Sequence, residues 1–143
     1  MNHLQQALEF RRKFGQLNLH PETPLGPENI AKLNMQLGLI EEEGNEFKEA
    51  LEEWVAAPST KAKAHALKEL ADLVYVCYQM AAFLNVDLEQ ALDRIHASNM
   101  SKLDDNGRPI YNESGKVMKG PNYRQPDLMN LVLGSQSTET LDD

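Results

Sequence analysis

The sequence is poor in cysteine and in aromatic residues, and it has no long apolar run. Its single cysteine, Cys77, cannot form a disulfide within the chain, which fits a reducing compartment such as the cytoplasm. Because Cys77 lies within the apolar run 73–78, we interpret it as a packing residue and not as a nucleophile. No stretch of about 18 apolar residues occurs, and the N-terminus lacks the basic-then-apolar layout of a signal peptide. We therefore expect a cytoplasmic protein that does not engage membranes.

Basic side chains are also in deficit. The chain carries 14 Lys and Arg against 22 Asp and Glu, for a formal charge of −8. Such a surface binds polymeric nucleic acid and anionic lipid poorly, although a small anionic substrate held through metal ions stays compatible with it. Aromatic residues make up only 6% of the 143 residues, while Leu, Ala and Met supply most of the apolar content. This composition favours an all-α domain over a β-sandwich.

The apolar spacing predicts four helices, at about 3–17, 28–56, 60–84 and 87–101. The first has Leu4, Leu8, Arg11 and Phe14 on one face, and three prolines make the segment after it a loop. Pro58 ends the second helix, and Ser59 or Thr60 can cap the third. The second helix has one apolar face, formed by Ile30, Leu33, Leu37, Ile40, Gly44, Phe47, Leu51 and Trp54.

The third helix has a wider apolar stripe, which includes Leu70, Leu73, Val74 and Val76. A stripe of this width predicts burial on two sides, against the second helix and against another subunit. After the fourth helix, turn signals at 104–107 and 113–115 surround short extended pieces and predict a hairpin. We expect one domain over residues 1–134, followed by a disordered acidic tail at 135–143.

Two pairs of acidic residues are the candidate functional residues. Glu43 and Glu46 lie on the second helix, and Glu69 and Asp72 on the third, each pair spaced so that both side chains share one face. At 100° per residue the four carboxylates border the apolar stripes, so an antiparallel pairing brings them together across the seam. Glu42 points away from it.

Four carboxylates without cations would repel one another, and oxygen ligands in that number suit Mg²⁺ or Mn²⁺. The ordinary alternative is that each acidic pair is simply a solvated helix face. His65 and His96 are too scattered to complete a zinc site, and no calcium-binding loop of alternating aspartates occurs. The spacing alone leaves a metal site and a solvated acidic surface equally open.

The acidic pairs, written Glu-Glu-Gly-Asn-Glu at 42–46 and Glu-Leu-Ala-Asp at 69–72, resemble the motifs of the all-α nucleoside triphosphate pyrophosphohydrolases. These MazG-type enzymes are grouped with dimeric dUTPases and phosphoribosyl-ATP pyrophosphatases. The segments 97–103 and 115–123 are similar to the C-terminal part of phage-type MazG-like proteins. The resemblance covers roughly residues 5–128. It implies a four-helix bundle-like fold in a homodimer or homotetramer, located in the host cytoplasm if the chain is phage-encoded.

Carried over by motif position, the resemblance implies metal ligands at Glu43, Glu46, Glu69 and Asp72, with two or more Mg²⁺ per site. Glu42 matches a motif position that is less often a direct ligand. A carboxylate at the cluster, Glu42 or Glu46, can also accept a proton from the attacking water. Asn99 and Lys102 match positions that contact substrate phosphates, and Lys116, Lys119 and Tyr123 are further candidates. The base is expected in an apolar pocket of the first two helices, where the candidates Phe10, Phe14 and Asn34 could equally be core or surface residues. One departure stands out, because the family often has Phe-His where this chain has Phe10-Arg11, which bears on base preference.

The implied reaction splits a nucleoside triphosphate between its α and β phosphates, giving a monophosphate and diphosphate. The demand on the protein is mainly positioning and charge stabilisation, which needs no nucleophilic side chain. The phage-type resemblance favours a deoxynucleotide such as dGTP. A dUTPase-like enzyme or a broad housecleaning enzyme stays an alternative, as does a helical dimerisation module whose acidic rows bind a basic partner.

Overall fold

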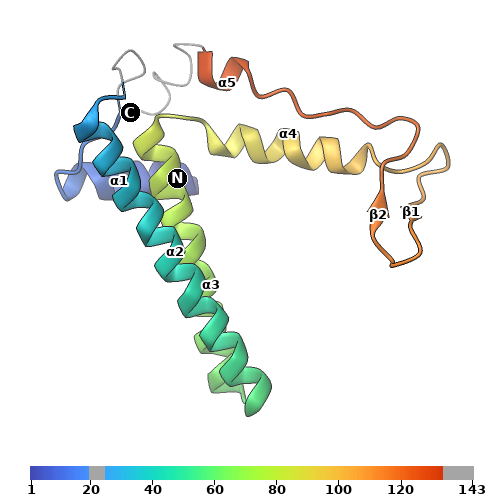
Figure 1. Cartoon of the computed structure of the whole chain (residues 1–143), viewed down its shortest axis with the longest axis horizontal. Helices are drawn as coiled ribbons and strands as arrows, with labels where there is room; N and C mark the ends of the chain where they lie inside the picture. The colour runs from blue at the N-terminus through green and yellow to red at the C-terminus, as the bar shows by residue number, and fades with distance from the viewer. Residues whose placement is uncertain (20–24, 134–143) are drawn as a thin grey trace.

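The structure is a computed structural model that describes residues 1–19 and 25–133. Over this part the chain is mostly helical, so the predicted all-α class is confirmed, and a single small hairpin follows the fourth helix (Figure 1). The predicted tail at 135–143 lies outside the described residues. The elements in chain order are α1 (His3–Lys13), α2 (Pro27–Ala56), α3 (Thr60–Leu84), α4 (Leu88–Met100), β1 (Ile110–Tyr111), β2 (Val117–Met118) and α5 (Asn130–Leu133).

Helix α1 is shorter than the sequence predicts, since it ends at Lys13 and not near residue 17. Gly15 adopts a left-handed conformation with φ of 67°, which a residue without a Cβ reaches at no steric cost. The Gln16 amide then donates to the Arg11 carbonyl at 2.8 Å, and the Gly15 amide donates to Arg12 at 3.3 Å. These two bonds form a Schellman end, which satisfies carbonyls of the last turn. Phe14 therefore lies beyond the helix and is exposed.

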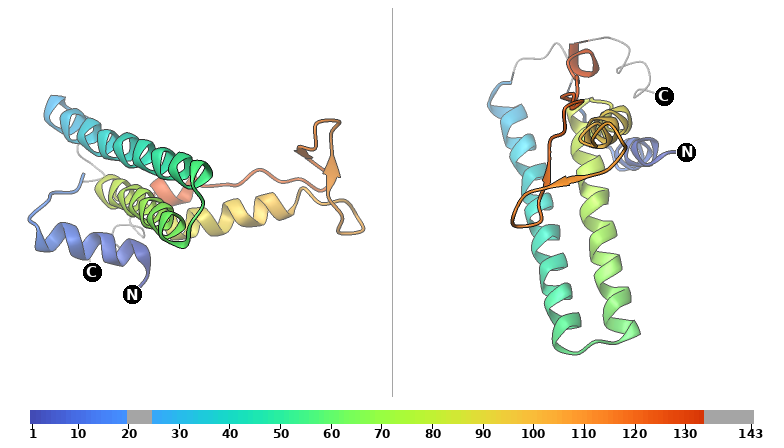
Figure 2. Two further views of the ribbon diagram at one scale, coloured as in Figure 1. Left: turned by 90° about the horizontal axis from the view of Figure 1, so that it is seen from below. Right: turned by 90° about the vertical axis from the view of Figure 1, so that its right-hand side faces the viewer.

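Helices α2 and α3 form a long antiparallel hairpin, which Figures 1 and 2 show as two helices side by side. Helix α2 begins at Pro27, where a missing amide hydrogen costs nothing. The connection follows from local chemistry, because Pro58 stops α2 and the Ser59 hydroxyl accepts from the Ala62 amide at 3.0 Å to start α3. Because the connection is short, α2 and α3 pack antiparallel, and each residue of α2 lies opposite a defined residue of α3.

The apolar core lies where α1 packs on the C-terminal half of α3. Small residues let these two helices approach closely, since Ala7, Ala81 and Ala82 are at most 4% exposed. The described core cluster consists of Leu4, Ala7, Leu8, Tyr78, Ala81 and Ala82, with Val86 and Leu88 packed against it. The base of the hairpin is therefore fixed by α1, while its far end is held mainly by α2 and α3 themselves.

Helix α4 extends away from the hairpin and carries the β1–β2 hairpin at its far end (Figures 1 and 2). Asn85 in the left-handed conformation ends α3, and the Asp87 carboxylate caps α4 by accepting from the Gln90 amide at 3.0 Å. Among the described residues α1 and α2 both pack on α3, whereas α4 makes few contacts with these helices. The expected four-helix bundle is therefore not formed within one chain. The segment from α4 to residue 128 is called the arm below.

The far end of the arm is held together by its own contacts. Strands β1 and β2 pair antiparallel, with Ile110 opposite Met118, which confirms the predicted hairpin. The segment 120–124 then returns to the end of α4, where the Ser98 hydroxyl donates to the Arg124 carbonyl at 2.7 Å and the Arg124 amide donates to Ser101 at 3.0 Å. Gly120 packs so closely that a Cβ there would lie 2.5 Å from the Lys102 carbonyl oxygen. Only glycine fits this approach.

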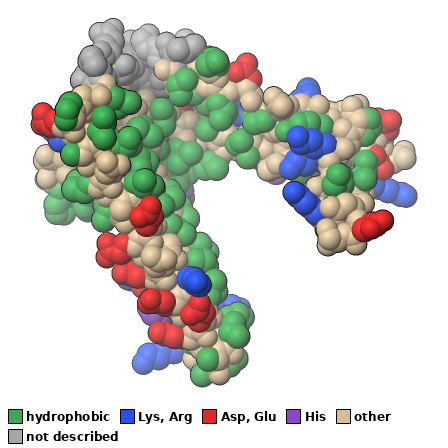
Figure 3. Space-filling model, viewed as in Figure 1, with side chains coloured by type: hydrophobic (Ala, Val, Ile, Leu, Met, Phe, Trp, Pro, Cys, Tyr) green, Lys and Arg blue, Asp and Glu red, His purple; other side chains and the backbone are tan. Residues whose placement is uncertain are grey.

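Much of the apolar surface of the long hairpin stays exposed. Leu37 and Leu51 of the predicted α2 stripe are 45% and 37% exposed, and Val74 of α3 is 45% exposed. Figure 3 shows apolar side chains along this hairpin and around the base of the arm. None of the described helices combines the length and apolar character needed to cross a membrane. The sequence predicted an α3 helix that is apolar on two sides, and in a single chain part of this apolar surface is exposed to solvent.

Candidate metal centre and active site

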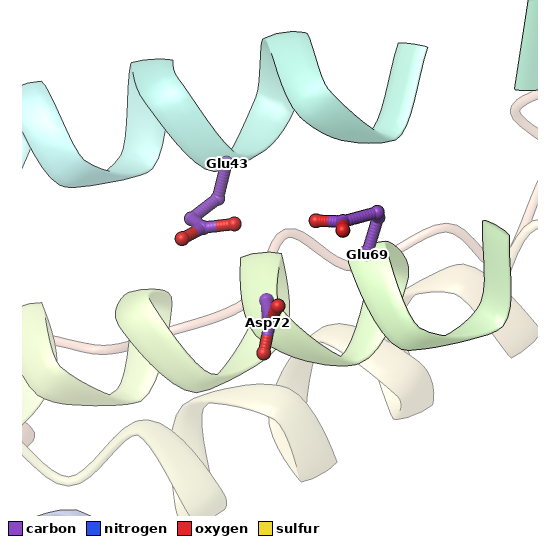
Figure 4. A group of neighbouring side chains, drawn as sticks. All are labelled: Glu43, Glu69 and Asp72. Carbon is purple, nitrogen blue, oxygen red and sulfur yellow. The ribbon is translucent and has the colours of Figure 1, made fainter. Parts of the chain in front are cut away.

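The acidic pairs of α2 and α3 meet in the seam of the hairpin. Glu43, Glu69 and Asp72 each offer a carboxylate oxygen such that all three atoms lie within 4.8 Å of one another. In Figure 4 Glu43 reaches from α2 toward α3, and the Glu69 carboxylate points toward it. The antiparallel hairpin places Glu43 opposite the turn that carries Glu69 and Asp72. Two positions three residues apart on α3 therefore face one position on α2.

Burial makes these carboxylates more than a solvated acidic surface. Glu69 is only 5% exposed, and its Oε2 atom is buried without a hydrogen-bond partner among the described residues. The Oε2 atom of Glu43 is in the same state. A buried carboxylate oxygen that lacks a donor is costly. A set of hard, anionic oxygens with unused lone pairs fits Mg²⁺ or Mn²⁺, which prefer such donors.

Glu46 joins the cluster from the next turn of α2. A hydrogen bond with Glu43, together with the nearby charges of Glu43 and Glu69, raises the pKa of Glu46 to about 7. The cause is crowding of like charges, since a proton shared between two carboxylates relieves their repulsion. All four residues predicted as metal ligands are thus neighbours. Glu42, predicted as a possible base, is exposed on the outer side of α2.

Two side chains that were not predicted as site residues contact these carboxylates, and one of them, Lys68, is a cation that balances part of the charge. Lys68 contacts Asp72 at 2.7 Å and Glu69 at 3.2 Å, and hydrogen bonds to these two carboxylates raise the pKa of Lys68. His65 lies 3.2 Å from Glu69. Both pairs that span four residues follow from helix geometry, because side chains at i and i+4 share a face. This spacing is visible in the sequence and is the signal by which both residues could have been found.

The residues of the cluster fall within a stretch that matches a known family. Residues 7–99 match the family described as phosphoribosyl-ATP pyrophosphohydrolase, which is more than half of the chain. The chain belongs to this family. It is therefore a member of the all-α MazG-like superfamily of nucleotide pyrophosphohydrolases, whose members are typically metal-dependent. No curated protein matches the sequence.

The family match ends at Asn99, so most of the predicted phosphate-binding residues lie in the arm beyond it. Gly120 brings the two sides of this region together by its contact with the Lys102 carbonyl. The Lys119 ammonium then lies over the Tyr123 ring, 4.8 Å from its centroid. Lys102, Lys119 and Tyr123 thus belong to one compact region, and Lys116 follows the turn of the β-hairpin.

This basic region is not next to the carboxylates within one chain. Figures 1 and 2 show the β-hairpin far from the middle of α2 and α3. In Figure 3 Lys and Arg side chains gather near the end of the arm, with some acidic side chains among them, while mostly acidic side chains follow the long hairpin across a hollow. The structure thus brings the predicted metal ligands together and keeps the predicted phosphate ligands apart from them.

The residues predicted near the base are also separated. Phe10 and Phe14 stack with their ring centroids 4.3 Å apart, and both line a cavity of about 400 Å³ beside Tyr75. Asn34 is exposed on α2 and does not line this cavity. The three residues therefore do not form one pocket.

Proposed function

We propose that the chain is a metal-dependent nucleoside triphosphate pyrophosphohydrolase that cleaves between the α and β phosphates and acts on deoxynucleotides such as dGTP. The observation that carries this proposal is the seam cluster, in which carboxylates from two helices meet and keep buried oxygens without donors. Membership of a pyrophosphohydrolase family supports the reaction type. Narrow action on dUTP and broad action on many nucleotides are the alternatives within the same chemistry.

We assign Glu43, Glu46, Glu69 and Asp72 as the ligands of two or more Mg²⁺ ions, with Mn²⁺ as a substitute. Bound ions of this kind supply positive charge for the phosphate oxygens and make a nearby water more acidic. The protein's own part is to fix the carboxylates on two rigid helices, so that little reorganisation is needed when substrate arrives. Between the two candidate bases the geometry favours Glu46, which touches the cluster, over Glu42, which faces solvent.

We further propose that the arm supplies Asn99, Lys102, Lys116, Lys119 and Tyr123 to the triphosphate, and that the chain works as a homodimer or homotetramer. Two features support an assembly. The long hairpin exposes apolar side chains of α2 and α3, and the arm exposes Ile110, Tyr111, Val117 and Met118. The basic end of the arm also complements the acidic hairpin (Figure 3). In this arrangement the lysines of one copy reach the carboxylates of another.

The test is a panel of nucleoside and deoxynucleoside triphosphates with Mg²⁺, assayed for released diphosphate. Wild type is expected to release diphosphate from at least one of them, and Glu46→Gln and Asp72→Asn to lose most of that activity. Glu49→Gln is the matched control, because Glu49 is exposed on the same helix three residues from Glu46. If no nucleotide yields diphosphate, the reaction is wrong, and the helical dimerisation module becomes the better reading. If both cluster variants stay fully active, the ligand assignment is wrong.

A further inference from the structure

A second cavity lies at the base of the long hairpin, apart from the carboxylates. It has a volume of about 250 Å³ and sits where the end of α1, the first turns of α2 and the end of α3 meet. Arg11 and Gln36 supply its buried polar groups, Lys32 adds a second cation, and Met35 and Phe83 add apolar surface. Among the described residues that line it, none is acidic. In a chain of net charge −8 this makes a locally cationic cavity.

Arg11 is a buried cation without a described anion. It is 3% exposed, and no carboxylate of the described residues lies within ion-pair distance of it. Burial lowers its pKa, which reflects the cost of holding the charge away from water. Its hydrogen bonds to described residues go to neutral oxygens, namely Asn18 at 2.5 Å, Leu17 at 2.6 Å, Gln16 at 3.2 Å and Gln79 at 3.5 Å. The guanidinium is therefore oriented by the protein and lies 5.6 Å from the centroid of the Phe83 ring, and no anion among residues 1–19 and 25–133 pairs with it.

Gln36 supplies the complementary group. Its side chain is 3% exposed and lines the cavity, yet its Oε1 atom has no hydrogen-bond partner among the described residues. A buried carbonyl without a donor destabilises the protein by about 1–3 kcal/mol, so a ligand that donates to it recovers that cost. The cavity thus combines a fixed donor that carries positive charge with an acceptor that lacks a donor.

The position of Gln36 connects this cavity to the metal cluster. Gln36 and Glu43 are seven residues apart on α2, which places them on the same helix face about 10.5 Å apart along the axis. In an extended nucleotide the sugar and the α phosphate separate the base from the outer phosphates. A triphosphate at the carboxylates can therefore place its base toward Gln36 along the same face.

We infer that this cavity binds the base of the nucleotide and selects a base with a carbonyl oxygen beside a ring N–H, as in guanine, uracil and thymine. The four hydrogen bonds of Arg11 to described residues leave one of its five N–H groups, on Nη2, for a ligand. Because arginine only donates, this group favours the carbonyl oxygen and opposes the amino group of adenine or cytosine. The unpaired Gln36 oxygen accepts from the ring N–H. The inference rests on the proposed function, because it takes the ligand to be the nucleotide held at the carboxylates.

The experiment compares bases that differ at this edge, in binding and in turnover. Isothermal titration with Mg²⁺ present measures dGMP against dAMP and dUMP against dCMP, and a diphosphate assay measures the corresponding triphosphates. Wild type is expected to favour the carbonyl-bearing member of each pair by roughly tenfold or more, since a site built to hydrogen-bond a group discriminates against its absence. Gln36→Leu should reduce this ratio about tenfold, while Gln125→Leu, the same change at an exposed glutamine of the arm, should leave it unchanged.

The outcomes separate this inference from the proposed reaction. Monophosphate binding with the expected preference, but without hydrolysis of any triphosphate, would support the cavity and overturn the reaction. Hydrolysis with no preference between the members of either pair in wild type would overturn the cavity and leave the reaction standing. The wild-type comparison needs no variant, so a poorly folded Gln36→Leu protein does not decide the matter. An unchanged ratio in a Gln36→Leu protein of normal melting temperature would also overturn the inference.

Discussion

Divalent-ion binding should weaken about tenfold between pH 8 and pH 6. The cause is Glu46, whose hydrogen bond with Glu43 and proximity to Glu69 raise its pKa to about 7. A carboxylate ligand must lose its proton before it binds a metal ion. With a pKa of about 7, roughly nine in ten Glu46 side chains are ionised at pH 8 and one in ten at pH 6. If binding requires the ionised form, the apparent Kd rises by that ratio.

The raised pKa of Glu46 has the opposite effect on the stability of the metal-free protein, which should decrease as the pH rises. Because the folded pKa of Glu46 lies above the ordinary glutamate value of 4.5, the folded state binds more protons than the unfolded state between about pH 4.5 and 7. The contribution of Glu46 to stability is therefore present at low pH and is lost as the pH rises toward 7. This contribution should make the metal-free protein melt at a lower temperature at pH 7.5 than at pH 5.5.

The assay is titration with Mn²⁺, followed by the electron paramagnetic resonance signal of the free ion, at pH 6, 7 and 8 and constant ionic strength. Glu46→Gln is expected to bind Mn²⁺ weakly and with a flatter pH dependence, whereas Glu49→Gln should follow wild type. A wild-type Kd that changes less than twofold across this range would refute the reasoning. So would a Glu46→Gln protein with the full tenfold dependence, since another group would then control binding.

Three further substitutions test other parts of the structure. Lys68→Met removes a cation that contacts Asp72 and Glu69, so Mn²⁺ affinity should rise, by up to about fivefold, because solvent screens the ion pairs of this exposed lysine and keeps their effect small. Calorimetry checks this, and weaker binding would show that Lys68 supports the site. Gly120→Ala should destabilise the docking of segment 120–124 by about 1–3 kcal/mol, because the added Cβ would lie 2.5 Å from the Lys102 carbonyl oxygen. Faster hydrogen exchange of the Arg124 amide would report this loss, and Gly38→Ala is the control, because a Cβ at Gly38 meets nothing within 4 Å. Leu4→Ala should lower the free energy of unfolding, measured in urea, by about 2–5 kcal/mol, because Leu4 is a core residue that is only 3% exposed. Leu67→Ala changes a 66% exposed residue and should alter this free energy little in the monomer, so equal effects of the two variants would contradict the described core.

The position of the carboxylates could be predicted from the sequence because two regularities control it. Helical spacing puts Glu43 and Glu46 on one edge of α2, and Glu69 and Asp72 on one edge of α3. Pro58 then forces a short reversal, so that α2 and α3 run antiparallel. Local rules alone therefore bring side chains from two segments into one seam.

Other features depended on long-range packing and were not predictable in this way. The helical period placed Arg11 on the apolar face of α1, but only the packed structure shows how residues 16–18 and Gln79 make its burial tolerable. Phe14 was predicted on that same face and is exposed, because the Gly15 turn ends the helix first. The direction of the arm depends on the backbone at Asn85, one residue whose left-handed conformation the apolar pattern does not encode.

The distance between the arm and the long hairpin has a consequence for how activity depends on abundance. If a working site needs the lysines of one copy and the carboxylates of another, a lone chain is inactive, and the number of sites grows roughly as the square of chain concentration while dimers are scarce. Specific activity would then fall on dilution. A cell that makes few copies would leave its nucleotide pool untouched, and a burst of expression would switch hydrolysis on sharply.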